Sequence, residues 1–170
     1  AGEDFQLRRI DNGGNPLLQL LSGVTIGVSG GVITVSGGTV VDSRPFAGVT
    51  SYTVDGAGGD DKLVIDYSVT PQLQSKNVTF TGGTGTDALY VSGGTFGKVV
   101  YNYTTATDGN IQNFTNPGDA TPVSTITYTG LEPITNTGTV TDIVFNLPAG
   151  GNVQAILEDD GTTPNTLTRL

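Results

Sequence analysis

The sequence predicts an all-β protein, and three observations support this prediction. Apolar residues recur in short alternating runs, and Gly, Asn, Asp or Pro closes each run. Much of the remaining chain is Gly, Thr, Ser and Asn, with 26 glycines in 170 residues. Helical signals are almost missing, since only Asn15 to Leu21 (NPLLQLL) could form a helical turn or two, and this segment fits a strand equally well.

The expected strands follow one another about every 8 to 12 residues, which is the spacing of an all-β protein. The stretch from Thr95 to Pro122 is expected to add a hairpin around the turn Thr107-Asp108-Gly109. The full set of expected strands is Val24–Val28, Val32–Val35, Thr39–Asp42, Thr50–Val54, Lys62–Tyr67, Val78–Thr81, Ala88–Val91, Lys98–Tyr103, Asn110–Thr115, Ser124–Thr129, Asp142–Asn146, Val153–Leu157 and Leu167–Leu170.

An internal repeat predicts how these strands are arranged. The unit is an aromatic strand, a Gly-rich turn, an Asp and a second apolar strand. Leu63 and Leu89 lie 26 residues apart (89 − 63), and Tyr52 and Phe80 lie 28 apart (80 − 52), separations expected of one solenoid coil. The three copies run over residues 51–65, 79–91 and 127–145.

Stacked copies would place like side chains on top of one another, an arrangement that packs well between neighbouring strands. Tyr52, Phe80 and Tyr128 are expected to point inward, because Ser or Thr flanks each of them. The sequence therefore predicts one elongated domain over residues 1–170, a parallel β-solenoid (β-helix) with an inserted hairpin. A tandem β-sandwich is the alternative. The expected outer rows are Ser51, Thr79 and Thr127, and Thr53, Thr81 and Thr129.

Composition excludes several function classes. The chain has no Cys or His, so it lacks thiolate nucleophiles and the commonest general base. Its paired carboxylates, Asp60 and Asp61, sit in a glycine turn, and no enzymatic activity is expected. A formal charge of −9 disfavours nucleic acid and anionic membranes as partners. No apolar run approaches the roughly 20 residues that span a bilayer, so no membrane insertion is expected.

One glycine-rich turn has a recognisable pattern. The segment Gly82–Tyr90 matches Gly-Gly-x-Gly-x-Asp-x-apolar-x, and Gly56–Val64 matches it except at Ala57. This resembles the haemolysin-type (RTX) calcium-binding nonapeptide, in which backbone carbonyls and the Asp hold calcium. The resemblance implies calcium as a ligand, held by Asp61, Asp87, Gly83 and Gly85. In that family the nonapeptides are consecutive, whereas whole strands separate them here. A Gly-rich turn whose Asp satisfies backbone amides is the alternative.

A second resemblance covers about half the chain. A Gly-rich strand (Asp60 to Asp66), a second one (Gly82 to Gly94) and the segment Ile126 to Ile134 follow in order. The set is similar to a repeat of giant bacterial cell-surface proteins that contain the sequence TYTGLEPI. The resemblance implies secretion, a cell-surface location and a repetitive, extended architecture.

The two resemblances lead to two functional expectations. The first is a structural module of a fibre or adhesin that assembles with itself through β-strand pairing. The alternative is a calcium-responsive extracellular module that binds a glycan or a surface protein. Residues Glu158 to Gly161 look like the start of another turn before the chain stops at Leu170, so a longer parent protein is expected.

Overall fold

The computed structural model describes residues 2–69 and 73–149, together with the short strand pairs at 158–159 and 168–169. Strands make up 61% of the structure. The described residues contain no α-helix, and the helical turns among them are 3-10 turns, η1 (Phe46–Gly48) and η2 (Leu73–Ser75). The prediction of an all-β protein is confirmed. The expected strand Val153–Leu157 lies outside the described residues.

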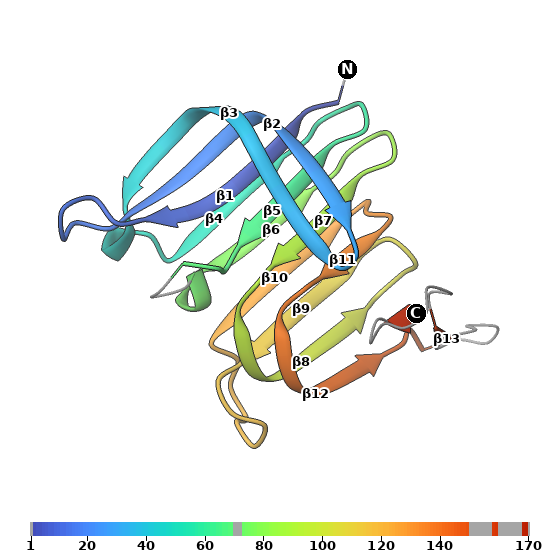
Figure 1. The fold of residues 1–170 in the computed structure, drawn as a ribbon. Coiled ribbons are helices and arrows are strands. Elements are labelled where there is room, and N and C mark those ends of the chain that lie inside the picture. The colour runs from blue at the N-terminus through green and yellow to red at the C-terminus, as the bar shows by residue number, and fades with distance from the viewer. Residues whose placement is uncertain (1, 70–72, 150–157, 160–167, 170) are drawn as a thin grey trace.

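Two mixed six-stranded sheets form the body of the molecule (Figure 1). Sheet A has the order β11 (Ile134–Asn136), β7 (Ala88–Ser92), β5 (Lys62–Asp66), β1 (Asp4–Ile10), β2 (Leu17–Ser29) and β3 (Val32–Pro45). Sheet B has the order β12 (Thr139–Asn146), β8 (Thr95–Tyr103), β9 (Gly109–Phe114), β10 (Ser124–Thr129), β6 (Asn77–Thr81) and β4 (Ser51–Asp55). The strands β13 (Glu158–Asp159) and β14 (Thr168–Arg169) form a separate antiparallel pair.

Three strand–turn–strand units connect the sheets. The pairs β4–β5, β6–β7 and β10–β11 each run one strand in sheet B and the next in sheet A. In sheet B, β6 pairs in parallel with both β4 and β10. In sheet A, β7 pairs in parallel with both β5 and β11. The first two units are offset by 26 residues in both sheets, since Ser51 pairs with Asn77 and Lys62 with Ala88.

The prediction that Tyr52, Phe80 and Tyr128 stack on one another is wrong for Tyr52. Phe80 lies opposite Tyr128, as expected, but its partner on β4 is Val54 rather than Tyr52. Tyr52 instead lies opposite Val78. The physical reason is that the 26-residue offset of the whole unit fixes the register, and the 28-residue spacing of the aromatic residues does not match it. The outer rows shift accordingly, to Thr53, Thr79 and Thr127, and to Asp55, Thr81 and Thr129.

The third repeat also differs from its prediction. Its second strand is the short β11, where Ile134 lies opposite Leu89. The predicted second strand, Asp142–Asn146, belongs to β12, which pairs in parallel with β8. The sequence Glu132-Pro133 stands here in place of the Gly-rich turn. The chain therefore reaches sheet A at Ile134, earlier than a turn leading to Asp142 would allow.

The predicted inserted hairpin is confirmed. Strands β8 and β9 pair antiparallel, with Lys98 opposite Phe114 and Tyr103 opposite Gly109. Strand β9 also pairs antiparallel with β10, so the hairpin extends sheet B beyond the third unit. Gly109 makes this fit possible, because a Cβ there would lie 2.7 Å from the Tyr128 hydroxyl.

Sheet A is extended at its other end by β1, β2 and β3. Strand β1 was not among the expected strands, although Phe5 and Leu7 alternate with polar residues. It lies between β2, which is antiparallel to it, and β5, which is parallel. The three expected strands between Val24 and Asp42 form parts of the long β2–β3 hairpin. Residues 17–21 of the segment that fitted either a helix or a strand belong to β2 and are therefore strand.

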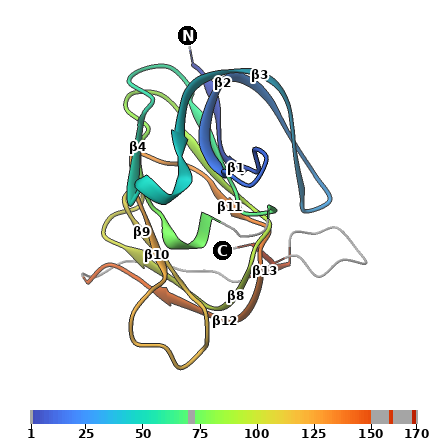
Figure 2. The same cartoon turned by 90° about the vertical axis from the view of Figure 1, so that its left-hand side faces the viewer.

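The β2–β3 hairpin adds a third layer over part of sheet A. Its pairing shifts register between Leu20 and Leu21, and β3 contacts β7. Figure 1 shows the hairpin crossing in front of sheet A, and Figure 2 shows it on the side away from β4, β9 and β10 of sheet B. Leu21, Val24 and Ile33 on the hairpin are buried, and so is Val64, which lies between the core residues of β5. Sheet A is therefore covered on both faces beneath the hairpin.

The main core lies between the sheets, where the two faces supply aliphatic and aromatic side chains. Tyr67 packs edge-on against Phe96, with ring centroids 5.5 Å apart. Burial raises the pKa of Tyr67 to about 12, while the polar groups of Ser124 and Asn113 lower it in part. Burial likewise raises the pKa of Tyr101 to about 12. Core members include Phe5, Leu7, Leu18, Val54, Leu63, Ile65, Val78, Phe80, Leu89, Val91, Val99, Ile111, Ile126 and Tyr128.

These tyrosines predict alkaline unfolding. A tyrosine in the unfolded chain ionises near pH 10, whereas folded Tyr67 and Tyr101 ionise near pH 12. Their contribution to stability is therefore complete below about pH 10 and is lost as the pH rises towards 12. We expect Tyr67→Phe to reduce that loss by about 2 to 3 kcal/mol. Urea unfolding followed by circular dichroism at pH 8, 10, 11 and 12 measures the free energy of unfolding of the unmodified protein and of the variant. An equal loss of stability in the two proteins between pH 8 and pH 12 contradicts the prediction.

Candidate functional site

The turns between the sheets form the first candidate site. The turn of residues 56–61 and the turn of residues 82–87 stack backbone on backbone. Gly58 and Thr84 form a parallel bridge, the Thr84 N–H donates to Ala57 O at 3.2 Å, and the Gly59 N–H donates to Thr84 O at 2.8 Å. The stacked turns thus join the parallel strand pairs of sheet B to those of sheet A.

Gly83 and Gly85, two of the residues expected to hold calcium, lie where the two turns touch. Their φ angles are 103° and 140°, which L side chains rarely adopt. A Cβ on Gly83 would lie 2.2 Å from Ala57 O, and a Cβ on Gly85 would lie 2.1 Å from Gly59 O. These glycines therefore allow one turn to approach the next closely, whether or not their carbonyls also bind a cation.

Asp61 and Asp87 occupy equivalent, fully enclosed positions at the ends of the two turns, 0% and 1% exposed. The Asp61 N–H donates to Asp87 Oδ1 at 2.8 Å. The Glu3 N–H, just before β1, donates to Asp61 Oδ1 at 2.6 Å. Each carboxylate thus satisfies a backbone amide of the neighbouring layer. This is the turn role of Asp that the sequence left open, except that the amide belongs to a different layer.

The second carboxylate oxygen of each Asp has a different environment. Asp61 Oδ2 and Asp87 Oδ2 are both buried and have no hydrogen-bond partner among the described residues. A Cβ on Gly82 would lie 2.6 Å from both Asp87 Oδ2 and Gly130 O. A Cβ on Gly56 would lie 2.8 Å from Asp61 Oδ2 and 2.6 Å from Gly82 O. Beside each glycine, a carboxylate oxygen and a carbonyl oxygen therefore border the same small space.

In each turn, a buried carboxylate oxygen without a donor lies near a carbonyl oxygen, which is a partial match to a calcium site. Calcium prefers carboxylate and carbonyl oxygens, which these are, but it takes six to eight of them. Among the described residues, no group of three or more acidic side chains gathers to hold a metal. Asp142, the Asp of the third copy, lies apart on β12 and is exposed. A cation between the turns would therefore need further oxygen ligands beyond these.

The inserted hairpin is tied to this end of the molecule. The Gly130 N–H donates to Asp108 Oδ1 at 2.9 Å, and the Leu131 N–H donates to Thr107 O at 3.0 Å. The hydrogen bond from Gly130 and the hydroxyl groups of Thr105 and Thr107 lower the pKa of Asp108. The loop of the hairpin therefore fixes the position at which the third unit turns towards sheet A.

Strand β12 forms the second candidate site. It ends sheet B, and its side chains are almost all exposed, including Ile143 (55%), Val144 and Phe145 (38%). The Phe145 ring stacks on Tyr101 of β8 at 5.0 Å between centroids. Asn146 Nδ2 donates to Asn102 Oδ1 at 2.7 Å, and Asn102 Nδ2 donates to Asn110 Oδ1 at 2.9 Å. An aromatic stack and an asparagine ladder both end at this edge.

Sequence reasoning missed both β12 as an edge and Glu3 as a partner of Asp61. The alternation of Phe5 and Leu7 could have indicated β1, and with it an N–H to cap the first turn. The edge position of β12 had no local signal, because the sequence from Thr139 to Asn146 resembles that of an internal strand. Its place follows from the inserted hairpin, which provides β8 as its partner.

Comparison with known proteins finds no family model that matches the chain, and no curated protein or solved structure with significant similarity to it. Within the part of the chain that the structure describes, no helix has the length and apolar character needed to cross a membrane. Functional inference therefore rests on the geometry of the turns and of the sheet edges.

The turn stack predicts a contrast between two glycines with positive φ. Gly85→Ala forces a Cβ against Gly59 O and should destabilise the protein by about 3 kcal/mol or more. Gly30→Ala, in the β2–β3 turn, has no atom within 4 Å of the added Cβ and should cost only about 1 kcal/mol. Urea unfolding measures both, and equal costs would contradict the close approach of the turns.

Proposed function

We propose that this chain is a structural module of a secreted bacterial surface or filament protein, such as a fibre or adhesin, which assembles with itself through β-strand pairing. In this proposal the three stacked units form a short parallel β-solenoid with an inserted hairpin. Parallel pairing of β4, β6 and β10 supports a solenoid over a sandwich, because sandwiches are built from antiparallel strands. The proposal assigns the module no catalytic role.

The proposal rests mainly on strand β12, which is an exposed and apolar edge strand of sheet B. An edge strand presents unpaired backbone groups that can pair with another chain. Soluble proteins usually protect such edges with charges, bulges or Pro, yet Thr139–Asn146 carries one charged residue, Asp142, and three large exposed apolar side chains. An exposed, apolar edge of eight residues favours addition of a further strand.

The resemblance to repetitive cell-surface proteins supports the extracellular location. A chain without Cys and Met also avoids oxidisable side chains, which suits a surface protein. The formal charge of −9 has a consequence for assembly, since identical modules repel one another until salt screens them.

Assembly should increase with protein concentration and with salt. We expect sedimentation velocity to show larger species as NaCl rises from about 0.02 M to 0.5 M, because the Debye length shortens over this range. Ile143→Lys, which places a charge on the apolar edge, should return the protein to a monomer. Thr79→Lys adds the same charge to the outer face of the interior strand β6 and should leave assembly nearly unchanged.

Two results would contradict the proposal. One is a protein that stays monomeric at every concentration and salt level. The other is an equal effect of Ile143→Lys and Thr79→Lys, which would show that added charge alone controls association. Circular dichroism of each variant establishes that the fold is retained.

A calcium-responsive extracellular binding module, for a glycan or a surface protein, is the second candidate. The buried, unpartnered Oδ2 atoms of Asp61 and Asp87 favour it. A buried carboxylate without a counterion is costly, and a bound cation would relieve that cost. This proposal differs from the first in requiring that stability or partner affinity depend on calcium.

Asp87→Asn tests this second candidate. The substitution keeps an oxygen to accept the Asp61 N–H and removes the buried charge. In EDTA, the variant should be as stable as the unmodified protein or more stable, by about 1 kcal/mol. In millimolar calcium, the unmodified protein should gain in Tm and the variant should not. Asp60→Asn, at an exposed position in the neighbouring turn, should keep the gain. An unmodified protein with the same Tm in calcium and EDTA argues against a calcium role.

A further inference from the structure

A groove runs along the free edge of β4, at the opposite end of sheet B from β12. It has a volume of about 470 Å³, and its walls come from the end of β3, from η1 and from β4 itself. The Tyr52 hydroxyl donates to Asp42 Oδ2 at 2.7 Å, and Arg44 Nε donates to Asp42 Oδ1 at 2.9 Å. The lining residues are Asp42, Arg44, Pro45, Gly48, Val49 and Thr50–Thr53.

The backbone of β4 offers hydrogen-bonding groups to this groove. Thr50 O accepts the Asn77 N–H at 3.1 Å, and the Gly56 N–H donates to Thr81 O at 2.9 Å, so both residues face β6. Backbone direction alternates along a strand. The N–H and C=O groups of Ser51, Thr53 and Asp55 therefore face away from β6, and β4 has no other strand partner among the described residues.

Strand direction identifies an occupant for the groove. Strand β12 is parallel to β8, which is antiparallel to β9, which in turn is antiparallel to β10. Strand β10 is parallel to β6, and β6 to β4, so β12 and β4 run the same way. A second copy displaced along sheet B without rotation would thus place its β4 beside β12 of the first copy as a parallel strand. Sheet B would then continue from one copy into the next.

The side chains agree with this pairing. One row crosses the whole of sheet B, through Phe145, Tyr101, Ile111, Ile126, Val78 and Tyr52. Its two ends are aromatic and incompletely buried. One further strand in the same register would place Phe145 of one copy beside Tyr52 of the next, and Val144 beside Ser51.

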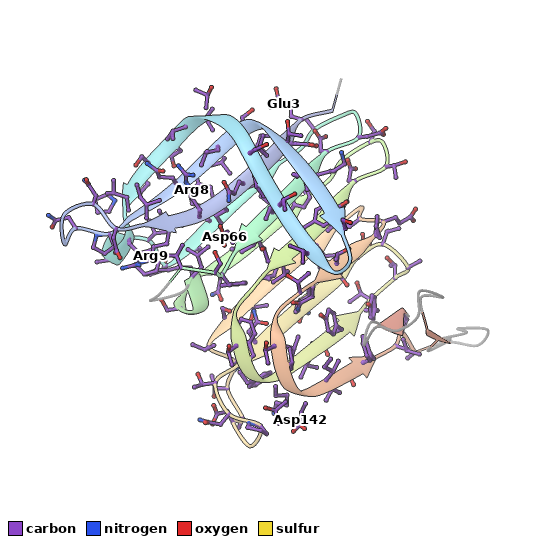
Figure 3. All side chains as sticks on the ribbon, viewed as in Figure 1. Glu3, Arg8, Arg9, Asp66 and Asp142 are labelled. Atoms are coloured by element: carbon purple, nitrogen blue, oxygen red, sulfur yellow. The ribbon has the colours of Figure 1, made fainter. Side chains whose placement is uncertain are left out.

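The two edges carry different charged side chains. Asp142 on β12 is exposed and has no ion-pair partner among the described residues. Figure 3 shows it at the end of the molecule opposite Glu3. The groove carries Arg44, whose side chain is 64% exposed although it contacts Asp42. Arg44 already pairs with Asp42 inside the groove, so it offers Asp142 of a neighbouring copy a second, exposed contact at the rim of a head-to-tail junction.

We propose that β12 of one copy pairs in parallel with β4 of the next, within the groove, so that copies join head to tail. This inference rests on the proposed function, since it names the two edges through which the module would assemble. A head-to-tail contact does not close on itself when the copies are related by translation, and it therefore extends into a filament.

Disulfide trapping tests the pairing, because the chain contains no cysteine of its own. In the double variant Ser51→Cys/Val144→Cys, mild oxidation should give a ladder of dimers, trimers and longer species on a non-reducing gel. A mixture of the two single variants should stop at dimers. Neighbouring strands bring Cα atoms within disulfide range only at the matching register.

The controls separate the alternatives. Dimers from Val144→Cys alone would show antiparallel pairing of two β12 edges and overturn the inference. A double variant that sediments as an assembly but does not cross-link would also overturn it, while leaving the proposed function intact. A double variant that stays monomeric at every concentration would count against both.

A second pair of variants addresses the backbone contact. Thr53→Pro removes an N–H that faces the groove rather than β6, so the fold should tolerate it. It should weaken association about tenfold or more, whereas Thr53→Ala should leave association nearly unchanged. Equal association of these two folded variants would exclude β4 as the acceptor strand.

Discussion

The close approach of two glycine turns sets the geometry of this molecule. Gly83 and Gly85 lie so near the carbonyls of Ala57 and Gly59 that no side chain fits between the turns. This contact fixes one unit against the next at an offset of 26 residues, and the parallel ladders on both sides adopt the same offset. Asp61 and Asp87 then cap amides across the layers. Residues of both sheets are thus positioned by a contact that involves few side-chain atoms.

Much of the fold could be predicted from composition and periodicity. Short apolar runs closed by Gly and Asp predicted an all-β chain, and the turn residues between Lys98 and Thr115 predicted the hairpin. Register was harder. Tyr52 and Phe80 look equivalent in sequence, but the backbone contact at the turns decides which residues lie opposite each other, and it places Val54 beside Phe80. Similar side chains are a weaker guide to register than the spacing of glycines that must touch.

The candidate sites show the same limit. The sequence identified Asp61 and Asp87 as a matched pair, and the structure places them in equivalent buried positions. It could not indicate that each would accept an amide from another layer, because Glu3 is 58 residues from Asp61. The edges β4 and β12 were also beyond local reasoning, since a strand becomes an edge only when the rest of the sheet is assembled. Long-range pairing supplies this information, and no short segment contains it.

The position of β1 bears on how the molecule would carry mechanical load. This strand lies inside sheet A, with β2 on one side and β5 on the other. A pull on the chain ahead of β1 acts along the strand, so it loads two rows of backbone hydrogen bonds in shear, and these rows must break together. Had β1 been an edge strand pulled sideways, its bonds would open one at a time under much smaller forces. The interior position of β1 therefore makes the start of the chain resistant to a pull along its own axis.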